Sequence, residues 1–153
     1  MRVVKRILLF LLVLLVLLQL IRPAKNKSNA AAPDDISQVK AVPADVQAIL
    51  QKACYDCHSN NTHYPWYVNI QPVGLYLAHH IEEGKDELNF NAFGAYSAKR
   101  QLSKLKGIAE QIKEGEMPLR SYTLLHKEAR LTAAEQTAVI KWVENTLNEN
   151  SKN

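Results

Sequence analysis

The two cysteines of this chain stand three positions apart and are followed directly by a histidine, in the segment Cys54-Tyr55-Asp56-Cys57-His58. Two thiols at this spacing can each add to a vinyl group of the same porphyrin, and the next residue then falls where an imidazole can bind the iron. The motif therefore predicts one covalently attached haem c. Cys54 and Cys57 would form the two thioether bonds, and His58 would be an axial iron ligand.

Two other chemistries also use a Cys-x-x-Cys pair. A thioredoxin-like redox pair needs a helix N-terminus, usually after a strand, whereas this pair follows the end of a helical pattern. Structural zinc needs two more ligands, and no second ligand pair in the chain has a recognised spacing. A thiol-redox site, a zinc site and a cysteine pair that only packs or forms a disulfide remain as disfavoured alternatives.

An iron bound by His58 has a second axial position, for which Met117 is the leading candidate. It is the one methionine besides Met1, and it lies in the segment Gly115-Glu116-Met117-Pro118. Pro118 biases Met117 toward extended backbone, which suits a loop that lays its side chain on a haem face. Besides an open position, the alternatives are three histidines: His79, His80 and His126.

An aromatic cluster follows the motif, and it includes Tyr64 and Trp66. Aromatic side chains can cover the apolar faces of a haem and exclude water from them. The sequence therefore predicts that Tyr64 and Trp66 contact the cofactor, although an ordinary core role explains them equally well. In a domain this small, we expect the haem to make up much of the core.

The N-terminus combines basic residues with an apolar run from Ile7 to Ile21 that only Gln19 interrupts. This pattern is typical of an export signal. Because no small-residue cleavage site lies close behind the run, residues 1–21 are predicted to form an uncleaved transmembrane helix in contact with the lipid bilayer. The run is short, since 15 residues rise about 22 Å against a hydrocarbon core of about 30 Å.

The compartment follows from the haem motif, because bacteria attach haem c outside the cytoplasmic membrane. We therefore expect a single-pass protein of the bacterial inner membrane whose C-terminal domain faces the periplasm. The formal charge of +4 depends on the N-terminus: residues 1–27 hold six basic residues and no acid, which leaves 13 basic and 15 acidic residues in the rest. A domain without excess positive charge has no nucleic-acid footprint.

The chain divides into the N-terminal segment, a flexible linker over residues 22–42, one domain over residues 43–148 and a disordered tail over residues 149–153. Within the domain, four segments have apolar residues at helical spacing, and none alternates like a strand. The predicted helices begin at Pro43 or Ala44 and run into Cys54, begin at Pro72 and end near Gly84, begin after the N-cap Ser97 and end at Gly115, and begin after the capping-box pair Thr132 and Glu135. The predicted fold class is all-α, with about four helices.

Several motifs lie at characteristic positions of the chain: Cys54-Tyr55-Asp56-Cys57-His58-Ser59-Asn60, Thr62, Tyr64-Pro65-Trp66, Gly115-Glu116-Met117-Pro118, Tyr122, His126, Ala129, Leu131, Glu135 and Trp142. Together these motifs resemble the bacterial haem-binding domain family of cytochrome c-like proteins, over roughly residues 38–147. The resemblance implies a mostly helical cytochrome c-like fold around a single covalently bound haem, in a membrane-anchored or exported protein. Leu119 departs from the pattern, because a second proline is common after the methionine.

Histidine and methionine together would saturate the iron and raise its reduction potential, which suits electron transfer. The sequence therefore predicts a membrane-anchored electron carrier, not an enzyme, that exchanges electrons with redox partner proteins of the membrane or periplasm. The alternative function is a haem-based peroxidase or small-ligand sensor, in which the sixth position is open.

Overall fold

The structure is a computed structural model that describes residues 1–150. Every regular element in this range is helical and no strand occurs in it, so the predicted all-α class is confirmed. The α-helices are α1 (Arg2–Leu18), α2 (Ile36–Val39), α3 (Ala44–Ala53), α4 (Tyr55–His58), α5 (Val73–Glu87), α6 (Ala98–Glu114), α7 (Arg120–Leu125) and α8 (Ala133–Asn150). Three 3₁₀ turns join them: η1 (Trp66–Asn69), η2 (Phe90–Ala95) and η3 (Lys127–Ala129).

The four predicted helices of the domain correspond to α3, α5, α6 and α8, and their ends follow the expected capping chemistry. The Ser97 side chain accepts a hydrogen bond from the backbone N–H of Arg100, and Gly115 ends α6 with a φ of 73°. That left-handed conformation favours glycine, which carries no Cβ. The Thr132 and Glu135 pair forms a reciprocal capping box at the start of α8.

Two boundaries differ from the prediction. Helix α5 continues past Gly84 to Glu87, because this glycine serves packing and not helix termination: a Cβ added at Gly84 would lie 3.0 Å from the carbonyl oxygen of Cys57. Helix α8 extends through residue 150, so residues 149 and 150 are helical and not part of a disordered tail. The other residues of the predicted tail lie outside the part of the chain that the structure describes.

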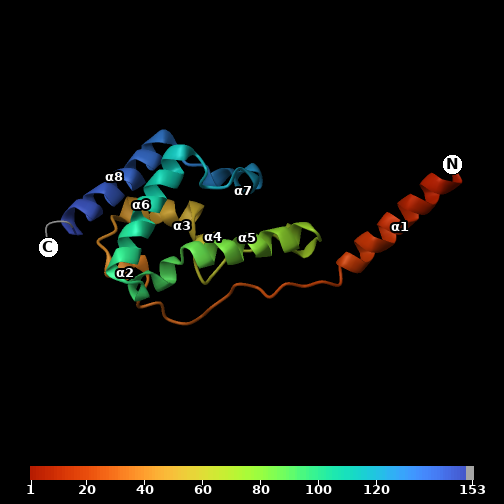
Figure 1. The fold of residues 1–153 in the computed structure, drawn as a ribbon, viewed down its shortest axis with the longest axis horizontal. Helices are drawn as coiled ribbons and strands as arrows, with labels where there is room; N and C mark the ends of the chain where they lie inside the picture. Colours follow the sequence, from red (N-terminus) through yellow and green to blue (C-terminus); the bar gives the residue numbers. More distant parts are fainter. Residues whose placement is uncertain (151–153) are drawn as a thin grey trace.

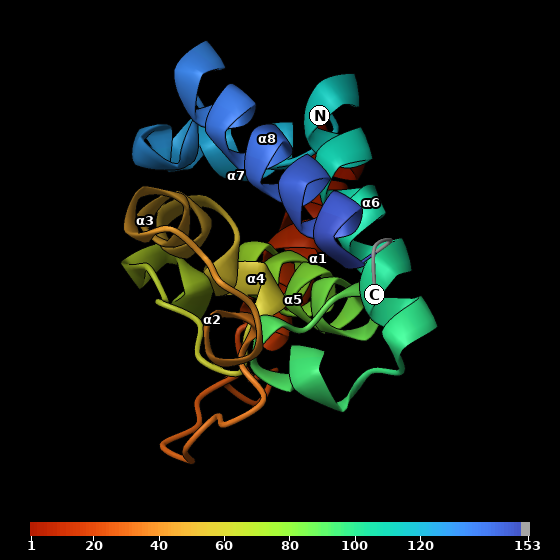
Figure 2. The same cartoon turned by 90° about the vertical axis from the view of Figure 1, so that its left-hand side faces the viewer.

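The apolar core lies between the long helices and the segments around them. Helix α6 packs along α8, and α3 packs against both α8 and α4; the two views show α6 and α8 side by side (Figures 1 and 2). The largest fully buried side chains include Phe90 and Phe93 of η2. The buried cluster consists of Ile36, Val46, Ile49, Leu50, Leu88, Phe90, Phe93, Leu105, Ile108, Ala109, Ile112, Val139, Trp142 and Val143.

Helix α1 projects away from the domain at one end of the molecule (Figure 1). Among residues 1–150, no helix is both long enough and apolar enough to cross a membrane. The predicted transmembrane helix is therefore not supported. The physical reason is length, since α1 ends at Leu18 and its 17 residues rise about 26 Å, less than a hydrocarbon core of about 30 Å.

The segment expected to be a flexible linker lies along the domain and contacts it. Asn26 donates to the Ser59 carbonyl over 2.8 Å, and its backbone N–H donates to the Tyr64 hydroxyl over 2.7 Å. Further along, α2 places Ile36 in the core with no exposed surface. Residues 22–42 thus make specific contacts that their polar, proline-containing sequence did not predict, because those contacts depend on partners more than 30 positions away.

Candidate functional site

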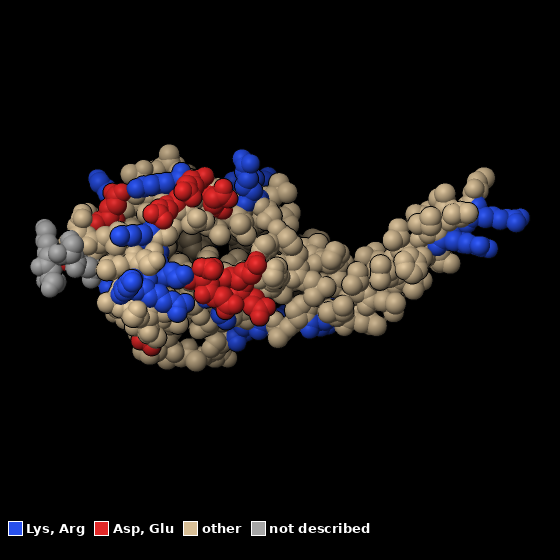
Figure 3. Space-filling view, in the orientation of Figure 1, with Lys and Arg blue, Asp and Glu red and all other residues tan. Residues whose placement is uncertain are grey.

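A cavity of about 530 Å³ opens beside the Cys-x-x-Cys-His segment. Its walls are formed by the end of α3, by α4, by the C-terminal half of α5, by the loop after α6 and by the start of α7. The space-filling view shows a hollow on this face, with acidic side chains beside it (Figure 3). Its lining residues are Ala53, Cys54, Cys57, His58, His80, Glu83, Gly84, Asp86, Glu87, Met117, Pro118, Leu119 and Tyr122.

His58 is oriented as a metal-binding histidine would be. Its Nδ1 lies 2.9 Å from the Leu88 carbonyl oxygen at the end of α5, which makes Nδ1 the protonated nitrogen. Burial lowers the pKa of His58, and the hydrogen bonds to the Leu88 and Gly84 carbonyls oppose this shift. Metal-binding histidines usually donate one ring N–H to a carbonyl or carboxylate while the other nitrogen binds the metal. Nε2 of His58 is the nitrogen left for iron.

Both cysteines line the cavity as free thiols. Burial, with a smaller contribution from Cys57, raises the pKa of Cys54 to about 12; burial and nearby Asp56 raise the pKa of Cys57 to about 11. A reactive redox pair needs at least one thiol with a lowered pKa, so this environment argues against thioredoxin-like chemistry. Zinc also lacks support, because the described residues include no group of three or more His, Cys, Asp or Glu side chains that could hold a metal ion.

Met117 reaches the same cavity from a distant part of the sequence. The left-handed Gly115 ends α6, and the backbone N–H of Met117 then donates to the Gln111 carbonyl over 3.2 Å. This turn reverses the chain before α7 and puts Met117 on the cavity wall. The cavity therefore brings together two thiols, the His58 imidazole and a thioether, which are groups that could attach haem c and bind its iron.

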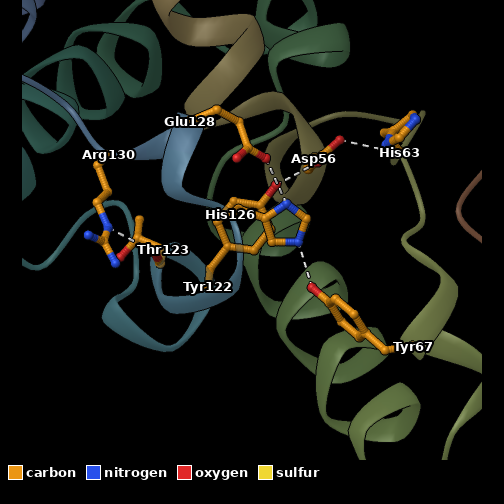
Figure 4. Close-up of polar contacts among 8 residues, drawn as sticks. All are labelled: Asp56, His63, Tyr67, Tyr122, Thr123, His126, Glu128 and Arg130. Carbon is orange, nitrogen blue, oxygen red and sulfur yellow. Dashed lines mark hydrogen bonds and ion pairs between the residues drawn. The ribbon is translucent and has the colours of Figure 1, made fainter.

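A hydrogen bond joins the motif to α7 across the cavity edge (Figure 4). The Tyr122 hydroxyl donates to Asp56 Oδ2 over 2.6 Å, and the Tyr122 ring stacks on His126 with 4.2 Å between the ring centroids. Burial raises the pKa of Tyr122, and Asp56 raises it further. No site role was predicted for Asp56 and Tyr122 from the sequence, although both belong to the motifs that resemble the haem-binding family. Their pairing could not be predicted, because they lie 66 positions apart.

His126, an alternative ligand in the sequence, is engaged elsewhere. Its Nε2 lies 2.5 Å from the Tyr67 hydroxyl, and its Nδ1 lies 3.1 Å from Glu128 Oε1 (Figure 4). Because both ring nitrogens have partners and His126 does not line the cavity, the structure does not place it at the site.

Tyr64 and Trp66 do not line the cavity either. The Trp66 side chain is 77 % exposed, and the Tyr64 hydroxyl accepts from the backbone N–H of Asn26. Neither aromatic residue is therefore among those that the structure brings to the cavity, and their contact with haem stays a prediction. Tyr64 instead packs against the N-terminal segment, where the Lys25 ammonium lies 5.7 Å from the centre of its ring.

The adjacent histidines of α5 point in different directions. His79 is 65 % exposed at its side chain and contacts Glu83 from the surface. His80 lines the cavity, and its Nε2 is buried without a hydrogen-bond partner. The sequence treated the two as equal alternatives, and helical geometry separates them by about 100°.

These residues fit a haem. The volume is in the range of small-molecule and cofactor sites, His58 has the tautomer that leaves Nε2 for iron, and a buried nitrogen of His80 lacks a partner. The family model of the haem-binding domain matches residues 13–145. The chain belongs to this haem-binding domain family, and haem is its cofactor. No curated protein and no solved structure matched the chain.

The cavity is separate from the apolar core. None of the buried residues in the core cluster lines it, although Cys54 packs against the cluster and also lines the cavity. Protein side chains fill the core cluster, and the cavity adjoins it at Cys54. The share of the core that haem makes up stays a prediction.

Proposed function

We propose that this protein is a c-type haem protein that transfers electrons. One observation carries the proposal: a single cavity brings together Cys54, Cys57 and His58 from one segment and Met117 from a loop about 60 positions later. No other group of residues in the described part of the chain offers both covalent attachment and two different iron ligands.

Each residue has a role that its chemistry supports. Cys54 and Cys57 would hold one haem through thioether bonds, His58 Nε2 would bind the iron, and Met117 would supply the second axial ligand. The bound haem supplies a one-electron couple. Ligation by both a histidine and a methionine would raise the reduction potential and leave no open position for oxygen or peroxide, which supports electron transfer to redox partner proteins and not enzymatic catalysis.

The location is part of the proposal. Covalent haem attachment in bacteria takes place outside the cytoplasmic membrane, so the domain would face the periplasm. Helix α1 exposes apolar side chains along most of its length, which supports contact of this segment with lipid. Fractionation of cells would test both points, and full-length protein found in the cytoplasm would contradict them.

The test uses protein matured by haem-attachment machinery. We expect a pyridine haemochrome spectrum of the c type and, in the ferric state, the weak far-red charge-transfer band of a thioether ligand. Met117→Ala should remove that band and lower the reduction potential, whereas Leu119→Ala, a neighbour on the same wall without a ligand atom, should keep it. A resting ferric protein that is high-spin and binds cyanide at once would instead favour the peroxidase or sensor function.

A further inference from the structure

His80 lines the cavity, and the proposed set of ligands leaves one of its nitrogens without a role. Nε2 of His80 is buried and has no hydrogen-bond partner, although the histidine side chain as a whole is 25 % exposed. A buried polar atom without a partner costs free energy, so a protein rarely keeps one that no ligand satisfies. Protein atoms cover Nε2 in this structure, so a partner can reach it only when they move, and the space that His80 lines is the cavity.

The other nitrogen of His80 fixes the ring. Nδ1 lies 3.2 Å from Glu83 Oε2, and the Tyr76 ring packs edge-on against the imidazole with 4.2 Å between centroids. A neutral ring whose Nδ1–H donates to Glu83 carries its lone pair on Nε2. This is the carboxylate–histidine arrangement that supports metal ligation. His58 has the same arrangement, with the Leu88 carbonyl in place of the carboxylate.

Helix α5 is long enough to carry His80 and also to place the Leu88 carbonyl beside His58. Leu88, which orients His58, and His80 are two turns apart, or about 12 Å along the helix axis. The helix therefore extends from the Leu88 carbonyl, which orients His58, to the part of the cavity wall that contains His80. The other two histidines considered as ligands do not offer this geometry, since His79 is exposed and both nitrogens of His126 have partners.

We propose that His80 is a reserve iron ligand, which takes the sixth position when Met117 leaves it. The proposal rests on the proposed function, because it needs a haem held by the cysteine motif. The exchange replaces one coordinate bond from Met117 Sδ with one from His80 Nε2. The proton stays on Nδ1 beside Glu83, so no proton or electron is gained or lost. With His80 bound in place of Met117, the iron would again have six ligands and would exclude small ligands.

The experiment compares ferric spectra of the mature holoprotein and four variants: Met117→Ala, Met117→Ala with His80→Ala, Met117→Ala with His80→Gln, and Met117→Ala with His79→Ala. We expect Met117→Ala to lose the far-red band but to remain low-spin by electron paramagnetic resonance. Both variants that also lack His80 should become high-spin, and added imidazole should restore the low-spin signal. The His79 variant is the matched control on the same helix and should remain low-spin.

The outcomes separate this proposal from the proposed function. A c-type spectrum with the far-red band in the wild type upholds the proposed ligand pair. With that pair in place, a high-spin signal from Met117→Ala alone, or a low-spin signal after loss of His80, would overturn the reserve role. Far-ultraviolet circular dichroism checks that each variant keeps its helices, and the glutamine variant preserves a polar side chain if alanine at position 80 unfolds the protein.

Discussion

The two halves of this domain are filled in different ways. Around α3, α6 and α8, side chains such as Phe93 and Val139 are completely buried and form a closed apolar cluster. Around α4, α5 and α7, the protein encloses a cavity of about 530 Å³ whose wall includes thiols, an imidazole and carboxylates. The first half is complete without a cofactor. The second half presents ligand atoms to a space that side chains do not fill.

This difference indicates how the haem contributes to stability. Burial of apolar surface is the main favourable term in folding, and the core cluster obtains it from the protein alone. The walls of the cavity are instead joined at their edges by contacts such as the Tyr122–Asp56 hydrogen bond. We expect haem to hold α7 and the Met117 loop in place while leaving the core helices largely independent of it. Variants in each half can test this division.

The largest effect is expected from Cys54→Ser combined with Cys57→Ser. Both thioether bonds would be lost, so the protein should retain no haem after denaturation and show no c-type haemochrome band. Because the core cluster lies apart from the cavity, most of the far-ultraviolet circular dichroism signal should remain. Hydrogen exchange should increase in α4 and α7 and change little in α6 and α8. Complete unfolding of the variant would show that the core depends on haem after all.

Phe93→Ala tests the other half. Phe93 is 0 % exposed, and truncation of a buried phenylalanine costs about 3–5 kcal/mol in the free energy of unfolding. Denaturant titration should show this loss with the haem attached and also in the cysteine-free variant. Leu124→Ala is the control, because a side chain that is 67 % exposed should change stability by only about 0.5 kcal/mol. Equal effects of the two variants would contradict the assignment of Phe93 to the core.

Tyr122→Phe examines the hydrogen bond between the two walls of the cavity. The substitution removes one hydroxyl that donates to Asp56 Oδ2 over 2.6 Å while the stacking ring is kept. We expect a loss of about 1–2 kcal/mol and a weakened far-red band, because the loop that holds Met117 becomes less fixed. Tyr76→Phe loses an exposed hydrogen bond to Ser121 and serves as the control, with the band intact. An unchanged band in both variants would remove the positioning role of Tyr122.

The smallest effect concerns pH and the contact between α3 and α8. The Lys52 ammonium, followed by the Thr132 backbone N–H, lowers the pKa of Glu135 from 4.5 to about 2. A carboxyl with a lowered pKa in the folded state stabilises the protein above its unfolded pKa, and this stability is lost as the pH falls from about 4.5 to about 2. The pair is partly exposed, so solvent screens it and the change is small. Glu135→Gln should flatten this part of the stability curve, and an unchanged acid slope would contradict the contribution.

Local patterns in the sequence were sufficient to predict the long helices of the domain. These patterns act over only a few residues, so they can be identified in the sequence alone. They are the apolar spacing of α3 and α6, the N-cap Ser97 and the helix-ending Gly115. Helices α2, α4 and α7 have only four to six residues, too few to show a period. Gly84 was misleading because its reason for being small is the Cys57 carbonyl, which lies 27 positions earlier and in contact only after folding.

The candidate site likewise has one part that the sequence predicted and another part that only the fold determined. The sequence by itself determined the motif at Cys54, Cys57 and His58 and the family to which it points, because covalent haem attachment needs fixed spacing within a single turn of chain. Only the tertiary structure decided which distant groups meet that motif. It brought Met117 and His80 to the cavity and kept Tyr64, Trp66, His79 and His126 away from it. Such contacts depend on how helices turn and pack against one another, and no short-range pattern in the sequence records that.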